Sequence, residues 1–296
     1  MKCTVTVIGG ANVDIGGRSA AALALRDSNP GFVSQRYGGV GRNIAHDLCL
    51  LGEHVRLITA IGGDLYGAGL RESCLRLGMD LSHSLILPEE RSSSYLYVTD
   101  GNGDMLVGIS DMGIVRRITP QALEGALGVI DASDAVIIDA NLEEETLAWI
   151  ASHCRAPLYA DPVSAAKAKR LRPVLGRLRA LKPNLLEAAA LTGETEPEAA
   201  AHALLARGVQ RVFLSLGSSG ILAAEGEERV ALPCEPQPVV NTTGAGDAAL
   251  AALVWADRRG RSLRDCARAA LHAGAVTSAC EEANHPDLAK LMESCL

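Results

Sequence analysis

The sequence predicts an α/β fold with a mostly parallel central sheet flanked by helices. Short runs of β-branched residues or leucine alternate, along the 296-residue chain, with segments whose apolar residues recur every three or four positions. Such alternation is typical of βαβ units, in which consecutive strands pair in parallel. A glycine pair, Gly9 and Gly10, ends the first run. Ligands of open α/β sheets bind at that place, beyond the carboxyl ends of the strands.

The individual elements follow from the same patterns. Buried strands are expected at residues 4–8, 55–60, 135–138, 158–160 and 211–215. Amphipathic helices are expected at residues 42–51, 65–77 and 120–130, where glycines or capping residues mark the ends. Beyond Pro236 and Pro238 the chain is predicted to be mostly helical, through residues 248–256 and 263–280.

Two segments near the amino end interrupt this alternation. Residues 16–37 lack a helical stripe, and residues 92–113 have the pattern of a β-hairpin with a polar turn at 100–104. We expect the two segments to form a small β-sheet that serves as an active-site lid. Residues 1–15, 38–91 and 114–296 would then make the α/β core. An ordinary edge hairpin explains the pattern equally well.

Composition excludes several classes of function. The net charge is −7 and aromatic residues make up 3% of the chain, which argues against binding nucleic acid. No charge-free apolar run reaches the roughly 18 residues of a membrane span. The eight cysteines include no C-x-x-C pair, so we interpret them as reduced thiols of a cytosolic protein. We therefore expect a cytoplasmic protein that acts on small metabolites.

The most informative motif is Asn-Thr-Thr-Gly-Ala-Gly-Asp at residues 241–247, which leads from a strand into an alanine-rich helix. Its glycines let the backbone approach a ligand, and the first amides of the helix can bind a phosphate. Asp247 would then accept a proton from an attacking hydroxyl, although a residue that only complements the helix dipole is the alternative. The stretch also matches the dinucleotide fingerprint G-x-G-x-x-A of nicotinamide and flavin enzymes. We rank that interpretation lower, because no strand ending in an acidic residue follows at the expected distance.

Two earlier motifs and two later ones are less specific. Asn12 and Asp14 follow the first strand, and a second glycine turn precedes Asn43. These residues either bind a ligand or only form tight turns. Asn184 and Glu187 either make a helix capping box or present oxygens to a hydrated Mg²⁺. Residues 215–220, rich in serine and glycine, form either a plain turn or a loop that lines a nucleotide site.

Taken in order, these motifs resemble those of the PfkB family, the ribokinase-like carbohydrate kinases. The two signatures are Gly38-Gly39-x-Gly41-x-Asn43 and Thr243-Gly244-Ala245-Gly246-Asp247, and the resemblance covers essentially the whole chain. Within the family the likeness is to pseudouridine kinases. It rests on residues 9–14, 27–31, 38–45, 110–112, 161–164 and 284–288.

The resemblance implies a three-layer ribokinase-like fold with a β lid, and transfer of the γ-phosphate of ATP to the 5′-hydroxyl of pseudouridine. A ribokinase or another nucleoside or sugar kinase is the alternative. A non-catalytic nucleoside-binding protein is disfavoured, because Asp247 is intact. The resemblance also implies Mg²⁺ and leaves K⁺ open, because many members have Asp where this chain has Asn241. We further expect a homodimer formed through the lid.

The resemblance assigns roles to particular positions. Asp247 is the expected base, with the amides of Gly244, Ala245 and Gly246 as the anion hole. The expected acceptor contacts are Asn12, Asp14, Gly39, Gly41, Asn43, Ser94, Asp111 and Asn141. The expected nucleotide contacts are Asn184, Ser215, Gly217, Gly220, Thr242 and Gly244. Asn184 and Glu187 are expected near Mg²⁺, which they would hold through water.

Overall fold

An eight-stranded sheet forms the centre of the computed structural model, which describes residues 4–100 and 104–293. The strands lie in the order β14-β13-β12-β11-β10-β9-β1-β4. All pair in parallel except β13 and β14, which form an antiparallel hairpin at one edge. Their bounds are β1 Thr4–Ile8, β4 His54–Ile58, β9 Ala135–Asp139, β10 Leu158–Asp161, β11 Leu178–Leu181, β12 Arg211–Ser215, β13 Ile221–Glu225 and β14 Glu228–Leu232.

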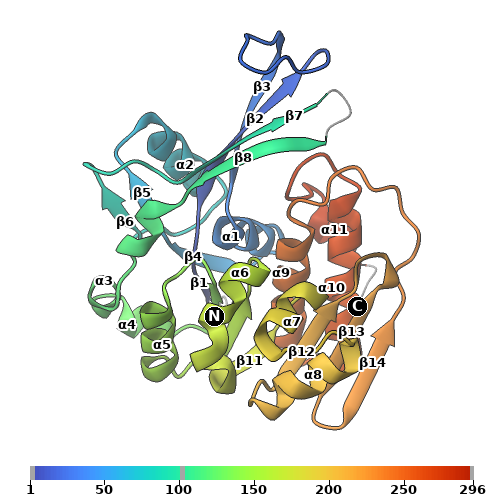
Figure 1. The fold of residues 1–296 in the computed structure, drawn as a ribbon. Coiled ribbons are helices and arrows are strands. Elements are labelled where there is room, and N and C mark those ends of the chain that lie inside the picture. Colours follow the sequence, from blue (N-terminus) through green and yellow to red (C-terminus); the bar gives the residue numbers. More distant parts are fainter. Residues whose placement is uncertain (1–3, 101–103, 294–296) are drawn as a thin grey trace.

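Helices cover both faces of this sheet (Figure 1). One apolar core lies between the sheet and α1 Val40–Leu50, α2 Leu65–Arg76, α9 Ala245–Asp257, α10 Leu263–Ser278 and α11 Leu288–Met292. A second core lies against α3 Pro120–Glu124, α4 Leu127–Asp131, α5 Glu144–His153, α6 Ala165–Ala168, α7 Leu185–Thr192 and α8 Pro197–Ala206. Side chains alternate between the cores along a strand: Val5 and Val7 enter the first, Ile8 the second. The expected three-layer α/β core is confirmed.

A separate four-stranded sheet, which we call the lid, rises from the core at the top of Figure 1. Its order is β3-β2-β7-β8, with β2 Asn12–Ser19, β3 Gly31–Gly38, β7 Ser94–Thr99 and β8 Met105–Asp111. The two predicted segments therefore do pair with each other, β2 running parallel to β7. The lid sheet begins at Asn12, inside the stretch 1–15 that was predicted to belong to the core. Part of the predicted polar turn, residues 101–103, lies outside the described residues.

Three predicted elements differ from the structure. The strand expected at 55–60 ends at Ile58, and the chain then enters β5 Ala60–Gly62, which pairs with β6 Leu85–Leu87 in a small sheet of its own. The helix expected at 120–130 is two short helices, because the chain breaks between them at Gly125 and Ala126. The helix expected at 248 begins at Ala245, so part of the glycine motif lies in its first turn.

The structure also bears on membrane spans and on the cysteines. Within residues 4–100 and 104–293 the structure has no helix long and apolar enough to cross a membrane. Each cysteine that the structure describes is free: Cys49, Cys74, Cys154, Cys234, Cys266 and Cys280.

Candidate active site

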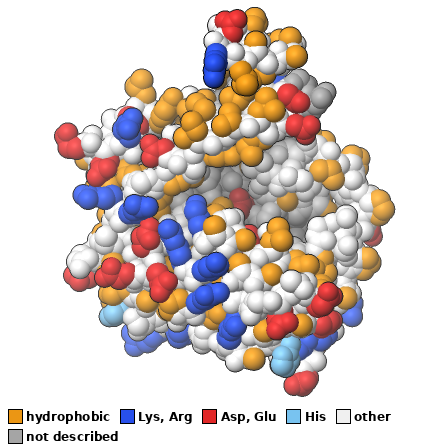
Figure 2. Space-filling model, in the orientation of Figure 1, with side chains coloured by type: hydrophobic (Ala, Val, Ile, Leu, Met, Phe, Trp, Pro, Cys, Tyr) orange, Lys and Arg blue, Asp and Glu red, His pale blue; other side chains and the backbone are white. Residues whose placement is uncertain are grey.

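The carboxyl ends of four parallel strands bring polar residues to one edge of the sheet. Gly9 and Gly10 follow β1, Asp139 ends β9, Asp161 ends β10, and Lys182 follows β11. The two aspartates and the lysine are buried. Figure 2 shows a hollow between the lid and this part of the core, with acidic side chains visible inside it. The cleft therefore lies where open α/β sheets bind their ligands.

The amino end of α9 faces this region, since a β-carbon on Gly246 would lie 3.4 Å from Lys182 Nζ. The amide of Ala245 donates to the Thr242 carbonyl at 3.4 Å. Gly244 precedes the helix with φ +83°, and a β-carbon there would overlap the carbonyl of Ala283. Only glycine adopts this conformation readily. The Asn241 side chain accepts a hydrogen bond from Thr243 N (3.0 Å) and donates one to the Glu281 carbonyl (3.0 Å), which fixes the approach to the helix. That Gly244, Ala245 and Gly246 form an anion hole stays a prediction, which their place at the amino end of a helix suits.

Asp247 lies in the first turn of α9 and is 8% exposed. Its Oδ2 accepts a hydrogen bond of 2.9 Å from Nδ2 of Asn43, so the structure joins the two predicted glycine motifs directly. Burial and the nearby charge of Asp161 raise the pKa of Asp247 to about 8, whereas the Asn43 hydrogen bond and the charge of Lys182 act to lower it. A carboxyl group with such a pKa can accept a proton near neutral pH.

The second glycine motif lies under the start of the lid. Gly39 has φ +99°, and a β-carbon there would lie 2.6 Å from the Gly10 carbonyl oxygen. Arg42 N donates to that same carbonyl at 3.1 Å. Gly41 is equally constrained, because its β-carbon would lie 2.9 Å from the backbone of Gly9. The glycines therefore permit close packing of α1 against the end of β1, which brings Asn43 to Asp247.

Asn12 and Asp14 stand at the base of the lid. Nδ2 of Asn12 donates to Oδ1 of Asp14 at 2.6 Å. Burial raises the pKa of Asp14, while the Asn12 hydrogen bond and the Arg42 charge oppose that change. Arg36, which pairs with Asp14 across β2 and β3, donates from Nη1 to the Glu281 carbonyl at 2.7 Å. This face of the lid therefore turns toward the loop that flanks the start of α9.

Ser94 and Asp111 do not join this group. The register pairs Val13 with Ser94 and Ser94 with Asp111, whereas it pairs Asp14 with Tyr95 and Tyr95 with Ser110. Because successive side chains of a strand alternate between faces, Ser94 and Asp111 lie on the sheet face opposite Asp14. That Ser94 and Asp111 contact the acceptor stays a prediction, while the register places their neighbours Tyr95 and Ser110 on the face of Asp14.

Tyr95 and Ser110 share the face of Asp14 and were missed in the sequence. The rings of Tyr95 and Tyr97 stack with centroids 5.7 Å apart. A β-carbon on Gly16 would meet the Tyr97 ring, and one on Gly108 would meet the Tyr95 ring. Glycines on the strands beside Tyr95 and Tyr97 could have indicated this face from the sequence, because a glycine leaves room for an aromatic ring to lie flat on a sheet.

Asn184 and Glu187 form the capping box at the start of α7. Asn184 Oδ1 accepts from Glu187 N at 2.9 Å, and Glu187 Oε2 accepts from Asn184 N at 2.9 Å. A bridge pairs Asn184 with Ser215, and the Ser215 hydroxyl donates to the Pro183 carbonyl at 3.3 Å. The strand ends β11 and β12 thus bring the predicted nucleotide contacts Asn184 and Ser215 together.

The other predicted contacts flank these groups. Gly217 and Gly220, at either end of the turn after β12, both have positive φ values, of +60° and +104°. Thr242 is exposed beside the start of α9. Asn141 is buried after β9, where its Oδ1 accepts from Lys167 Nζ at 2.7 Å and its N donates to Asp139 Oδ1 at 2.9 Å. Asp139 also accepts from Gly10 N at 2.8 Å, so it ties β1 to β9.

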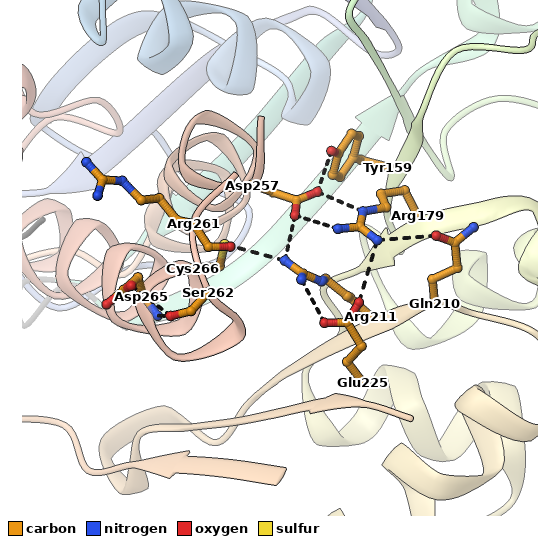
Figure 3. A network of polar contacts seen from close by, with 10 residues as sticks. All are labelled: Tyr159, Arg179, Gln210, Arg211, Glu225, Asp257, Arg261, Ser262, Asp265 and Cys266. Atoms are coloured by element: carbon orange, nitrogen blue, oxygen red, sulfur yellow. Dashed lines mark hydrogen bonds and ion pairs between the residues drawn. The ribbon is translucent and has the colours of Figure 1, made fainter. Parts of the chain in front are cut away.

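The carboxyl end of α9 is anchored near the amino ends of the strands, opposite the cleft (Figure 3). Asp257 accepts hydrogen bonds from Tyr159 Oη (2.6 Å), Arg179 Nη2 (2.9 Å) and Arg211 Nη1 (2.6 Å). Burial acts to raise the pKa of Asp257, but the hydrogen bonds from Arg179 and Tyr159 hold that pKa below its ordinary value. This network ties the helix to β10, β11 and β12, the strands whose other ends form the cleft.

The chain is similar to known carbohydrate kinases along nearly its whole length. A family model described as pfkB family carbohydrate kinase matches residues 3–290. The chain is 38% identical to the pseudouridine kinase of Escherichia coli (strain K12), over 97% of this chain and 94% of the relative. It is 33% identical to an uncharacterized sugar kinase of that organism, YeiI, over 95% of this chain and 80% of the relative. A solved carbohydrate kinase from Agrobacterium tumefaciens matches with a TM-score of 0.89 at 31% identity, over 99% of this chain and 96% of that one.

Proposed function

This chain belongs to the pfkB family of carbohydrate kinases and is a phosphotransferase that acts on a hydroxyl group; we propose that it transfers the γ-phosphate of ATP to the 5′-hydroxyl of pseudouridine. The observation that carries the proposal is the buried Asp247 at the amide end of α9. The carboxylate takes the proton of the acceptor hydroxyl, and the amides stabilise the charge on the phosphoryl group. Positioning and charge neutralisation complete the reaction, which needs no covalent intermediate.

The acceptor is proposed to lie between Asp247 and the lid. Asp14 accepts hydrogen bonds from ribose hydroxyls, and the stacked Tyr95 and Tyr97 offer a face for a base. A plain sugar has no aromatic base to stack there, so this feature favours a nucleoside over ribose. The 38% identity with a pseudouridine kinase favours the same choice. The 33% identity with an uncharacterized sugar kinase supports the alternative, a sugar kinase.

The residues near α7 suit magnesium bound through water. Asn184 Oδ1 and Glu187 Oε2 each accept one hydrogen bond within the capping box, and each oxygen has a further lone pair for a water ligand. Mg²⁺ keeps several waters and takes few protein ligands. When bound, it would neutralise part of the phosphate charge. ATP is supplied in the cytoplasm, where we place the enzyme, and activation by K⁺ stays a prediction.

An assay of ADP release tests the proposed acceptor. With Mg·ATP, we expect kcat/KM for pseudouridine to exceed that for uridine, adenosine, ribose and fructose, because a site that hydrogen-bonds its substrate rejects analogues that leave those groups unpaired. A higher kcat/KM for ribose or fructose would favour the sugar kinase instead. No acceptor-dependent ADP release with any member of the panel would contradict the proposed function altogether.

Replacing Asp14 by alanine is expected to weaken acceptor binding. Hydrogen bonds to a charged group contribute about 1.5–3 kcal/mol, so kcat/KM for the acceptor should fall by roughly tenfold to over a hundredfold. The KM for ATP should change little, because Asp14 belongs to the lid. Steady-state kinetics with each substrate varied in turn check this. Unchanged acceptor kinetics in a folded variant would remove Asp14 from the site.

The lid is also proposed to join two copies of the chain. On the face opposite Asp14, the register aligns Ile15 with Leu96 and Ile109, and Gly17 with Val98 and Val107. Leu96, Val107 and Ile109 are 41%, 52% and 62% exposed. Contiguous apolar patches on a folded surface mark interaction sites.

Sedimentation velocity tests this interface. We expect the wild-type protein to sediment as a dimer and Ile109→Glu to sediment as a monomer, because a charge would be buried in the interface. The matched control is Leu75→Glu on α2, where an apolar side chain is 47% exposed away from the lid; it should remain a dimer. A monomeric wild-type protein would refute the interface.

A further inference from the structure

Lys182 is a buried cation at the centre of the cleft to which the mechanism above gives no role. It directly follows β11 and is 5% exposed, the one buried lysine in the described part of the chain. Its side chain runs toward the start of α9: a β-carbon built on Gly246 would lie 3.4 Å from Lys182 Nζ. The ammonium group therefore lies against the amides of the proposed anion hole.

The ammonium group is loosely bound. Within residues 4–100 and 104–293, its one polar partner is Asp161, whose Oδ2 lies 3.4 Å from Nζ. Charge-assisted hydrogen bonds between an ammonium and a carboxylate are usually about 2.7–2.9 Å long. Because an ammonium group has three donors, Lys182 can bond to a ligand without first losing a strong contact.

The surroundings keep Lys182 charged. Burial acts to lower its pKa, but the carboxyl groups of Asp161, Glu187 and Asp247 raise that pKa above the ordinary value. Asp139 adds a further buried acid that interacts with Asp161 and Asp247. The cleft therefore contains more acids than bases before any nucleotide enters. A polyphosphate bound there needs a cation close to the oxygens that are transferred.

We propose that Lys182 is a catalytic residue whose ammonium group leaves Asp161 and bonds to an oxygen of the phosphoryl group in transfer. The proposal rests on the proposed kinase function. The bond between the γ-phosphorus and the oxygen that bridges it to ADP breaks, while a bond forms from that phosphorus to the acceptor oxygen. The acceptor proton goes to Asp247, and Lys182 keeps all three of its protons. Its ammonium group supplies positive charge that stabilises the oxygens of the phosphoryl group during transfer.

A purely structural ion pair between β10 and β11 is the competing explanation. In that case Lys182 would matter only because its loss leaves Asp161 buried and unpaired. Removing both partners would then restore activity. If Lys182 acts on the phosphate, removing Asp161 as well cannot replace the missing charge. The double variant therefore separates the two explanations, and because it does not leave Asp161 charged without its partner it also serves if the single variant fails to fold.

The test compares Lys182→Met, Asp161→Asn and the double variant with wild-type enzyme. We expect Lys182→Met to lower turnover by about 10²–10³-fold and the double variant to remain as slow. By calorimetry, Lys182→Met should lose about tenfold or more in affinity for the Mg²⁺ complex of the non-hydrolysable ATP analogue AMP-PNP, and much less for ADP. The acid limb of its pH profile should move to higher pH, because Lys182 acts to lower the pKa of Asp247.

Three results would overturn the role of Lys182. These are turnover of Lys182→Met within about threefold of wild type, recovery of turnover in the double variant, and equal loss of affinity for AMP-PNP and ADP. Each leaves the kinase function intact, because the first two require a wild-type enzyme that turns over and the third requires a wild-type enzyme that binds the ATP analogue. Absence of turnover in the wild type with every acceptor would instead contradict the proposed function.

Discussion

Replacing Asp247 by asparagine is expected to lower turnover by about 10²–10⁴-fold, with nucleotide affinity nearly retained. Asparagine keeps the size of the side chain and an oxygen that accepts from Asn43 Nδ2, but it cannot take the acceptor proton. If Asp247 only complemented the helix dipole, its loss would cost about 0.3–1 kcal/mol of stability and the enzyme would keep working. Measuring kcat and the thermal midpoint of the same variant distinguishes these accounts.

The pH dependence gives a second measure of this residue. Because the pKa of Asp247 is raised to about 8, kcat/KM should rise about tenfold per pH unit from about pH 6 and level off above pH 8. The raised pKa also means that the folded wild-type protein loses stability as the pH rises from the ordinary carboxyl value through about 8. The Asp247→Asn variant does not lose stability in this way, because asparagine does not ionise. The variant should therefore be at least as stable as wild type at alkaline pH, whereas a residue that only complements the dipole predicts a lower midpoint.

Replacing Gly244 by alanine should disable the enzyme through geometry alone. The positive φ of +83° costs an alanine about 1–2 kcal/mol, and its β-carbon would collide with the Ala283 carbonyl. The loop before α9 must then shift, and a displacement of about 1 Å at a reacting centre can cost roughly 10²-fold in rate. We expect a loss of turnover of that order together with a lower thermal midpoint.

Gly52→Ala is the matched control for this change. Gly52 has φ +81°, close to that of Gly244, but nothing lies within 4 Å of the position of its β-carbon. The Gly52→Ala variant should lose a similar amount of stability to its positive φ, but its turnover should stay normal. Equal turnover of the two variants would mean that the contact between Gly244 and Ala283 does not position the anion hole.

Local pattern was sufficient for much of the core and for the glycine motifs. The buried strands β1, β9, β10 and β12 read directly as apolar runs, and the glycine pattern placed the start of α9 within a few residues. The hairpin of β13 and β14 was missed. Its sequences ILAAE and ERVAL contain alanines and charged residues, which have low preference for strands. Pairing with β12 and burial of Ile221, Ala223 and Val230 in the first core stabilise the hairpin.

The site required information that spacing does not contain. Ser94 and Tyr95 are neighbours in sequence, and only the register of β2 against β7 shows which of them faces Asp14. Lys182, Asp161 and Asp247 come from two strand ends and a helix that are distant along the chain. Their electrostatic coupling depends on long-range packing, so the sequence pattern alone gave Lys182 no role. Strand ends that carry buried charged residues are the signal that would have found it.

The position of phosphate in the product tests the central claim, phosphoryl transfer to a 5′-hydroxyl beside Asp247, most directly. Wild-type enzyme is incubated with Mg·ATP and pseudouridine, and the purified nucleotide is examined by phosphorus and proton NMR. The account predicts a single product whose phosphorus couples to the two protons of the 5′-methylene group, formed in equal amount to ADP. Phosphate on the 2′- or 3′-hydroxyl, or release of ADP without a phosphorylated nucleoside, would contradict it.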